Sequence, residues 1–388
     1  MKLLPWEYAV RNLGRSPLRT VLGAGGAGLV VLLVMAAGAF VRGMQQSLRV
    51  SGSPDNVILL GAGSEESVER SEIDSSAAGQ VQAGIRGIRS LLDVAFVSPE
   101  VHLAMELGLE RDDPTGHSAL LRGVTPAAFL VHQSVRIVAG RAPMPGADEM
   151  MVGALAATRM GVSPARLAVG QTLWLDGRPW TISGHFESPG TVLAAEIWLP
   201  LSDLQIAARR DSLSCIIVTL DGADFDDVDA FCKQRLDLEL VAMRETDYYA
   251  NLADFYAPVR AMVWITAALI ATGGLLGGLN TMYAVFAARV RELGTLQTIG
   301  FSRRAIVVSF VQESLLSGLA GALVAAALAM ALLDSLAVRF SMGAFGLIVD
   351  STVVLWGLAA AMALGVAGAL PPAWRCLRLE IPVALKAA

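Results

Sequence analysis

A short basic segment, residues 289–304, reads RVRELGTLQTIGFSRR and stands between two long stretches without charged residues. Such uncharged runs occur four times, at Thr20–Val41, Ala261–Ala288, Ser314–Leu333 and Ser351–Trp374, with lengths of 22, 28, 20 and 24 residues. An α-helix needs about 20 residues to cross the hydrocarbon core of a bilayer. The chain is therefore predicted to be a membrane protein with four transmembrane α-helices, one before and three after a large polar insert.

The composition agrees with this interpretation. Of 388 residues, 54% are hydrophobic and 17% are charged, and the mean hydropathy is +0.55, which is more apolar than expected of a soluble protein of this length. The predicted order is a cytoplasmic amphipathic helix (1–19), the first transmembrane helix (20–41), an extracytoplasmic α+β domain (42–258), the second transmembrane helix (259–288), a cytoplasmic loop (289–304), the third transmembrane helix (305–333), a short extracytoplasmic loop (334–350), the fourth transmembrane helix (351–374) and a cytoplasmic tail (375–388).

Three short basic segments set the predicted orientation. Residues 1–19 carry a net charge of +3, residues 289–304 a net charge of +3, and the tail from residue 375 a net charge of +2. All three fall on one side of a four-span layout, and the positive-inside rule makes that side cytoplasmic. The insert 42–259, with a net charge of −12, falls on the other side. Both termini are therefore expected in the cytoplasm.

The first apolar run is interpreted as a retained span, because its 22 residues exceed the roughly 7–15 of a signal-peptide core. The residues before it alternate at helical spacing between apolar and polar side chains, which predicts a helix lying in the membrane surface. The apolar set is Leu4, Trp6, Ala9, Val10 and Leu13, and the polar set is Arg11, Asn12 and Arg15.

The insert has the pattern of a folded α+β domain. Short apolar or alternating runs predict strands at Val57–Leu60, Ala119–Gly123, Glu149–Val152, Thr172–Leu175, Trp180–Gly184, Ile197–Leu199, Leu213–Leu220 and Leu240–Met243. Helices are predicted at Val81–Leu92, Ala154–Met160, Leu201–Ala208 and Phe225–Leu238, the last capped by Asp224. Asp176-Gly177 predicts a hairpin turn. Residues 246–258 are expected to be helical and to run without a break into the second span.

A search for catalytic or cofactor sites finds little. There is no Walker motif for ATP, and no nucleic-acid partner is expected. The four histidines, His102, His117, His132 and His185, show no ligand spacing, so no metal site is predicted. Cys215 and Cys232 lie in the insert, where they either form a disulfide or are two small buried residues.

The predicted spans contain one acidic side chain, Glu313, which is by default a functional candidate but also lies near enough to the cytoplasmic end to bond a neighbouring helix. Small residues at a spacing of four, including Gly273, Gly274, Gly277 and Gly278, favour close helix packing over a water-filled pore. The one-plus-three layout also lacks the repeated halves of a secondary transporter.

Three further patterns point to a known family. They are Arg291-Glu292-Leu293-Gly294 followed by Gly300-Phe301-Ser302-Arg303-Arg304 and Glu313; PPAWRCLRLEIPVAL at 371–385; and, in the insert, Gly140-Arg141, Asp148-Glu149, Val169-Gly170 and residues 180–184. With the one-plus-three topology, they resemble the permeases of MacB/FtsX/LolC-type (type VII) ABC transporters and, in the insert, the MacB periplasmic core domain. This chain has no fused ATPase, and Ile299 stands where the family commonly has alanine.

The resemblance implies a permease subunit of the bacterial inner membrane that transmits motion from a separate cytoplasmic ATPase dimer to the extracytoplasmic domain (mechanotransmission). Residues 289–304 would then form the coupling loop; its coupling residues would be Arg291, Glu292, Leu293, Gly294, Leu296, Ile299, Gly300, Phe301, Arg303 and Arg304. Arg303 and Arg304 taken alone are equally well explained as interface anchors. The partner would bind ATP and Mg²⁺, and this chain would need no cofactor.

Other expected partners are a second permease copy or a paralogue, membrane lipids, and a periplasmic adaptor or lipoprotein. The expected substrate of export or extraction is lipid-linked or amphipathic. Two alternatives stay open: an FtsX-like regulator of a cell-wall hydrolase, and a membrane-anchored sensor without energy coupling. A neighbouring gene for a small ATPase would favour the ABC permease or the FtsX-like regulator over the sensor.

Overall fold

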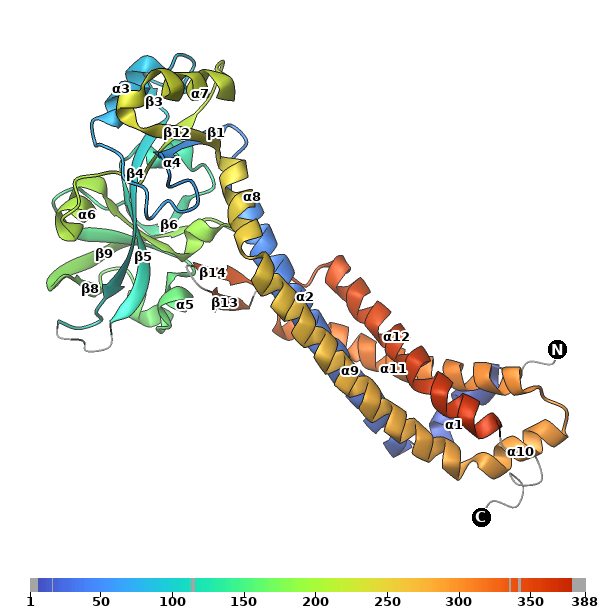
Figure 1. Ribbon diagram of the computed structural model, residues 1–388. Coiled ribbons are helices and arrows are strands. Elements are labelled where there is room, and N and C mark those ends of the chain that lie inside the picture. Colours follow the sequence, from blue (N-terminus) through green and yellow to red (C-terminus); the bar gives the residue numbers. More distant parts are fainter. Residues whose placement is uncertain are drawn as a thin grey trace. The chain divides into compact units, whose positions relative to one another are not determined.

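The computed structural model describes residues 6–15, 17–111, 113, 116–334, 336–340 and 343–378. The chain forms two compact units (Figure 1). The helical unit comprises Met1–Arg42, Pro258–Leu336 and Leu347–Ala388, and the α+β unit comprises Gly43–Ala257 and Ala337–Gly346. The chain therefore passes from one unit to the other at four points.

The helical unit contains α1 (Trp6–Arg15), most of α2 (Pro17–Ser51), α9 (Ala257–Ala288), α10 (Val290–Thr298), α11 (Arg303–Leu332) and α12 (Ser351–Leu377). Four of these are long and apolar enough to cross a membrane, over Thr20–Ser51, Ala257–Ala288, Arg303–Leu332 and Ser351–Arg375. Helices suit these segments because each helix satisfies its own backbone hydrogen bonds where no water is available. The predicted one-plus-three arrangement is confirmed.

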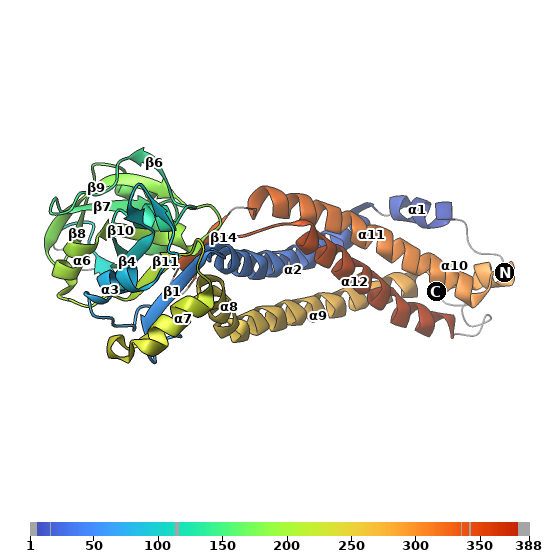
Figure 2. The ribbon, with the colours of Figure 1, turned by 90° about the horizontal axis from the view of Figure 1, so that it is seen from above.

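Small residues bring these helices close together (Figure 2). A Cβ atom on Gly321 of α11 would lie 2.1 Å from the Ala24 carbonyl oxygen of α2, and one on Gly28 would lie 2.8 Å from the Gly321 carbonyl oxygen. Of the glycines singled out in α9, Gly274 packs against Val30, whereas Gly273, Gly277 and Gly278 are exposed with nothing within 4 Å of a Cβ position. The role of those three in helix packing stays a prediction.

A ten-stranded sheet forms the α+β unit, in the order β12-β1-β11-β4-β5-β10-β7-β9-β6, with β8 paired to β9. The pairs are antiparallel except β5 with β10 and β7 with β9. The strands are β1 (Asn56–Gly61), β4 (Val97–Leu107), β5 (His117–Val124), β6 (Arg136–Gly140), β7 (Glu149–Gly153), β8 (Thr172–Leu175), β9 (Arg178–Glu187), β10 (Glu196–Pro200), β11 (Cys215–Thr219) and β12 (Leu240–Arg244).

A large apolar core and a smaller one around Trp198 are formed by the sheet and its short helices. These helices are α3 (Ala77–Gly84), α4 (Ala128–Val131), α5 (Ala156–Met160), α6 (Leu201–Ala208), α7 (Phe225–Gln234) and α8 (Glu245–Phe255), with 3₁₀ turns η1 (Pro164–Leu167), η2 (Val192–Ala195) and η3 (Leu236–Leu238). The Asp224 amide donates to the Asp227 carboxylate over 2.9 Å, in a capping box that starts α7. Asp176 and Gly177 both have positive φ and join β8 to β9, so this hairpin turn is confirmed.

Three local expectations are corrected. The helix expected at Val81–Leu92 is α3 and ends at Gly84, because Ile85 is extended and Gly87 has φ +87°. The unbroken helix expected over 246–258 is interrupted at Tyr256, because Pro258 has no amide to continue the hydrogen-bond ladder.

The third correction concerns the segment between α11 and α12, for which the sequence predicts a simple loop. It contains the hairpin of β13 (Ala337–Phe340) and β14 (Gly343–Gly346), which packs within the α+β unit against α5 and η2. A separate two-stranded ladder joins β2 (Ser90–Leu91) to β3 (Val94–Ala95).

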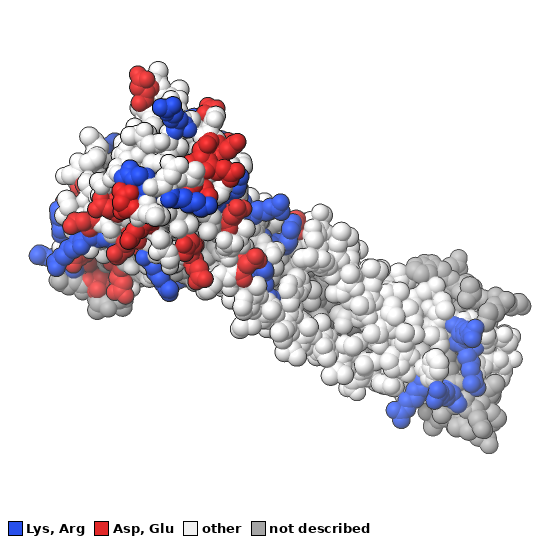
Figure 3. Space-filling model, turned by 45° about the horizontal axis from the view of Figure 1, so that its top comes forward, with Lys and Arg blue, Asp and Glu red and all other residues white. Residues whose placement is uncertain are grey.

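The surfaces of the two units differ in charge (Figure 3). Acidic and basic side chains are scattered over the visible face of the α+β unit, whereas the visible helices are largely free of them except for basic side chains at one end. A face without charges suits contact with lipid, and cationic side chains at a helix end suit the phosphate region of a membrane.

Candidate functional site

The segment singled out first, residues 289–304, folds as a short helix between two turns. α9 ends at Ala288, α10 covers Val290–Thr298, and Gly300 follows with φ +100°. Ser302 then caps α11, its hydroxyl accepting from the Ala305 amide over 3.2 Å. Since residues with a side chain resist a positive φ, the chain reverses at the one position in this turn where glycine stands.

A polar cluster ties α10 to two other helices. Arg289, which precedes α10, donates from Nε to Glu292 Oε2 over 3.0 Å and from Nη1 to Glu313 Oε2 over 3.2 Å. From α1, Asn12 Nδ2 donates to Glu313 Oε2 and the Tyr8 hydroxyl donates to Glu292 Oε1, each over 2.5 Å. We call these five residues, Tyr8, Asn12, Arg289, Glu292 and Glu313, the Arg289 cluster.

The Arg289 cluster lies in an apolar setting. The Arg289 side chain is only 9% exposed, and its guanidinium carbon lies 4.9 Å from the centre of the Phe310 ring. Phe286 packs on the same ring, with the two centroids 4.1 Å apart. An ion pair with so little water is held rigidly, because separating its partners would leave an unpaired buried charge. α1, α10 and α11 are therefore fixed to each other at this point.

The residues predicted for coupling divide into two sets. Glu292, Leu293, Gly294, Leu296 and Phe301 face inward or pack against the cluster formed by Phe286, Ile306 and Phe310. Arg291, Ile299, Gly300, Arg303 and Arg304 are exposed, and Ile299 is 69% exposed despite its apolar side chain. Gly294 is expected from the sequence to end or bend a helix, but it lies inside α10. The coupling role of all ten residues stays a prediction.

Sequence reasoning missed Tyr8, Asn12 and Arg289 as partners of Glu313. The amphipathic pattern places Asn12 on the polar side of a surface helix, yet it is 4% exposed and bonded to a residue 301 positions away. The local sequence gives little indication of this burial, apart from the apolar residues, such as Ala9, that share the helix with Asn12. Arg289 could have been found from its position directly after the longest uncharged run, where a cation near a carboxylate is the natural counter-ion.

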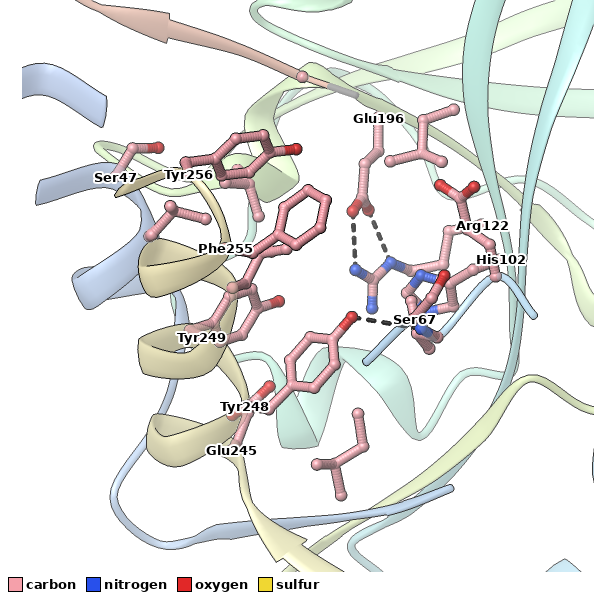
Figure 4. A pocket seen from close by; sticks show the side chains of 18 of the residues that line it. Ser47, Ser67, His102, Arg122, Glu196, Glu245, Tyr248, Tyr249, Phe255 and Tyr256 are labelled. Carbon is pink, nitrogen blue, oxygen red and sulfur yellow. Dashed lines mark hydrogen bonds and ion pairs between the residues drawn. The ribbon is translucent and has the colours of Figure 1, made fainter. Parts of the chain in front are cut away.

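A second polar cluster lies inside the α+β unit. Arg122 of β5 donates from Nε and Nη2 to both oxygens of Glu196, over 2.6 and 2.7 Å, and from Nη1 to Glu100 over 2.6 Å. His132 Nε2 lies 2.7 Å from the other Glu100 oxygen. All four side chains are buried. Figure 4 shows Arg122 and Glu196 meeting at the wall of a cavity.

These pairings shift the pKa values of the buried groups. Burial acts against the charged form of Glu100, but His132 and Arg122 hold the pKa of its carboxyl well below the ordinary value. Burial is the largest single influence on His132 and lowers its pKa, but the charge of Glu100, its hydrogen bond and the charge of Glu245 together raise the pKa above the ordinary value. Both shifts act in favour of the ion-paired form, an imidazolium beside a carboxylate, over the neutral pair.

Glu100, His102 and Cys215 also place three possible metal-ligand atoms within 4.8 Å of one another. The Glu100 oxygens are already bonded to Ser98, His102, Arg122 and His132. A guanidinium 2.6 Å from the carboxylate repels a second cation. These atoms are thus accounted for as a hydrogen-bond network. Cys215 and Cys232 are both buried and free, and burial raises the pKa of Cys232 to about 11.

The raised pKa of His132 predicts a pH-dependent contribution to stability. A raised folded-state pKa stabilises the fold below the unfolded value of about 6.5, and this contribution is lost as the pH rises through the folded value. As the pH rises above about 6.5, the free energy of unfolding should therefore fall more steeply in the wild type than in His132→Gln. Urea titrations of both chains, followed by tryptophan fluorescence, measure the difference. Parallel pH profiles would contradict it.

Comparisons with known proteins agree with the architecture. Residues 20–231 match the family of the MacB-like periplasmic core domain, and residues 264–381 match the FtsX-like permease C-terminal family. A protein of Bacillus subtilis (strain 168), described as the uncharacterized ABC transporter permease YknZ, is 21% identical over 379 residues, which cover 92% of this chain and 91% of the relative.

Two solved structures resemble the α+β unit, each with 14% identity. The periplasmic region of MacB from Actinobacillus actinomycetemcomitans has a TM-score of 0.40 and covers 53% of this chain and 95% of its own. The extracellular domain of the noncanonic ABC-type transporter YknZ from Gram-positive bacteria has a TM-score of 0.36 and covers 48% and 99%.

Proposed function

We infer, because this chain belongs to the MacB- and FtsX-like ABC transporter permeases, that it couples ATP hydrolysis by a separate cytoplasmic ATPase to movement of its α+β unit. In this proposal the chain sits in the bacterial inner membrane with both termini and α10 in the cytoplasm. ATP and Mg²⁺ bind to the partner, and this chain supplies no catalytic residue.

The observation that carries the proposal is the construction of α10. Exposed residues occur within α10 (Arg291), directly after it (Ile299) and at the start of α11 (Arg303 and Arg304). One apolar side chain and several cations suit docking on a protein surface with acidic groups. α10 itself is fixed through Glu292 and Arg289 to α1 and α11. A push on the exposed residues therefore reaches the long helices directly.

The route from those helices to the α+β unit is covalent. The chain crosses between the units at four points, two of them at the ends of the β13–β14 hairpin. Glu313 is bonded to Arg289 and Asn12. The four chain crossings and the bonded state of Glu313 support mechanotransmission, in which the helices carry motion. The substrate, a lipid-linked or amphipathic molecule, then does not pass between the helices.

Docking is tested by placing a charge at Ile299, the exposed apolar residue directly after α10. Ile299→Asp should abolish co-purification of the partner ATPase with the permease, because burying an unpaired carboxylate at an interface costs more than the contact provides. The control is Val138→Asp, the same type of change at a 54% exposed position on β6. The partner in this test is an ABC ATPase that is co-expressed with the permease.

Retention of the ATPase by Ile299→Asp at the wild-type level would contradict docking through α10. The same result would leave the cytoplasmic position of residues 289–304 resting on the positive-inside rule alone. Loss of the ATPase with both variants would show a general defect and would equally contradict a specific role for Ile299.

A further inference from the structure

We propose that the α+β unit contains a binding site for an amphipathic cation, a molecule with an apolar body and a protonated amine. The site is a cavity of about 400 Å³ between α8, the last turns of α2, the sheet and the β13–β14 hairpin (Figure 4). This volume lies in the range of small-molecule sites, roughly 300–1,000 Å³. The proposal goes beyond coupling to an ATPase and does not depend on it.

The walls of the cavity are apolar and rich in aromatic rings. α8 presents Tyr248, Leu252 and Phe255 at helical spacing, and α2 presents Met44 and Leu48. Phe340 and Phe345 come from the hairpin, and the Phe340 ring packs edge-on against Tyr256 with centroids 5.1 Å apart. Aromatic faces attract cations as well as apolar groups, so such walls suit an amine attached to a hydrophobic body.

Four carboxylates line the cavity, Glu66, Glu69, Glu196 and Glu245, against two guanidinium groups, Arg70 and Arg122, so the excess of negative charge favours a cation. Arg122 is neutralised by Glu196 and Glu100, and thus offers little attraction to an anion. Glu245, at the start of α8, is 2% exposed, and its Oε2 accepts from the Ser53 amide and from Asn56, each over 2.9 Å. Neither Glu245 nor the half-buried Glu69 forms an ion pair with a described residue. A buried carboxylate without a counter-ion favours a ligand that brings one.

A second observation also points to a ligand. Ser47 lines the cavity from α2 and is 4% exposed, yet its hydroxyl oxygen has no hydrogen-bond partner among the described residues. A buried hydroxyl without a partner is costly, and a serine in a helix usually bonds a carbonyl of the preceding turn. Such a hydroxyl is an acceptor for an ammonium group, as are the carboxylates that line the cavity. Burial raises the pKa of Glu245, as expected for a carboxyl that lacks such a partner.

The test uses three fluorescent probes that share a dansyl group and an alkyl chain and differ at the chain end. Dansylcadaverine ends in an ammonium, the dansyl pentylamide is neutral, and dansyl aminocaproate ends in a carboxylate. Each probe is titrated into the full-length chain in detergent micelles, and the signal from empty micelles is subtracted. We expect the cation to bind at least about tenfold more tightly than the other two, as for a hydrogen bond between charged groups.

Two kinds of variant distinguish the effect of the cavity's carboxylate charges from the effect of its volume. Glu245→Gln keeps an oxygen for the Ser53 amide and should weaken binding of the cation by about tenfold while leaving the neutral probe unchanged. Glu69→Gln should act in the same direction and needs no buried residue to be repacked. Leu252→Trp fills the cavity and should weaken binding of all three probes. Glu187→Gln, an exposed carboxylate on β9 outside the cavity, should change none.

Equal affinities for the three probes would overturn the proposal and would indicate an apolar cavity that takes a neutral lipid chain. Unchanged affinity for the cation in both Glu245→Gln and Glu69→Gln would overturn it as well, as would binding that survives Leu252→Trp. Because none of these readouts involves ATP, they stand apart from the docking test on Ile299.

Discussion

Replacing Arg122 by methionine is expected to destabilise the α+β unit by about 3–5 kcal/mol, the usual cost of removing one partner from a buried ion pair. The side chains of Arg122, Glu100 and Glu196 are all at most 2% exposed. Without the guanidinium, Glu100 keeps its histidine neighbours. Among the described side chains, Glu196 then keeps only the Trp198 indole, which donates over 2.8 Å. A carboxylate left in this state must either take up a proton or draw in water.

Urea unfolding of the full-length chain, followed by the fluorescence of Trp198 and the other tryptophans, measures this loss. Two comparisons make the measurement specific. Arg141→Met breaks a pair with Glu149 in which the arginine is 53% exposed, and it should shift the unfolding midpoint little. Adding Glu196→Gln to Arg122→Met removes the orphaned charge and should recover part of the lost stability. Equal midpoints for Arg122→Met and Arg141→Met would contradict the account.

The elements that could be predicted from the sequence are those whose signal is local. Four uncharged runs of 20 residues or more are typical of membrane spans and rare in soluble domains. The Asp176-Gly177 turn and the Asp224 cap depend on residues that are adjacent or three apart. The strand β4 was missed because Pro99 and Glu100 interrupt its apolar pattern. Glu100 is tolerated there only because Arg122 and His132 come to it from β5 and the end of α4, and no local pattern contains that information.

The candidate sites show the same division. The motif around α10 could be found from the sequence, and its Gly300 has φ +100°, a conformation that glycine adopts without strain. The partners of Glu313 could not be found, because Asn12 and Arg289 lie 301 and 24 positions away. The cavity beside α8 was also missed, since its walls come from distant segments and include a hairpin in a region for which the sequence predicts a loop.

Gly300→Val is expected to uncouple the permease from its ATPase by about tenfold or more. A β-branched residue at φ +100° costs roughly 1–2 kcal/mol or more, and the turn between α10 and α11 is expected to change direction to avoid this cost. A barrier increase of this size corresponds to about a tenfold change in rate. Gly300→Asn is the graded control, because asparagine accepts a positive φ more readily and should retain part of the coupling.

A second control addresses backbone strain as such. Gly170 has φ +87° and open space around its Cβ position, but it lies in the α+β unit. Gly170→Val should therefore leave coupling intact even if it lowers stability. Arg303→Ala and Arg304→Ala address the competing hypothesis that the loop is a set of interface anchors, under which the arginines set the yield in the membrane and Gly300→Val has little effect.

The most direct test of the central claim is the ATP hydrolysis rate of the purified permease–ATPase complex in lipid nanodiscs, compared with that of the ATPase alone. The account predicts that the wild-type permease changes this rate, that Gly300→Val forms the complex but loses at least about nine-tenths of the change, and that Gly170→Val retains it. A Gly300→Val complex that regulates its ATPase as the wild type does would contradict coupling through α10.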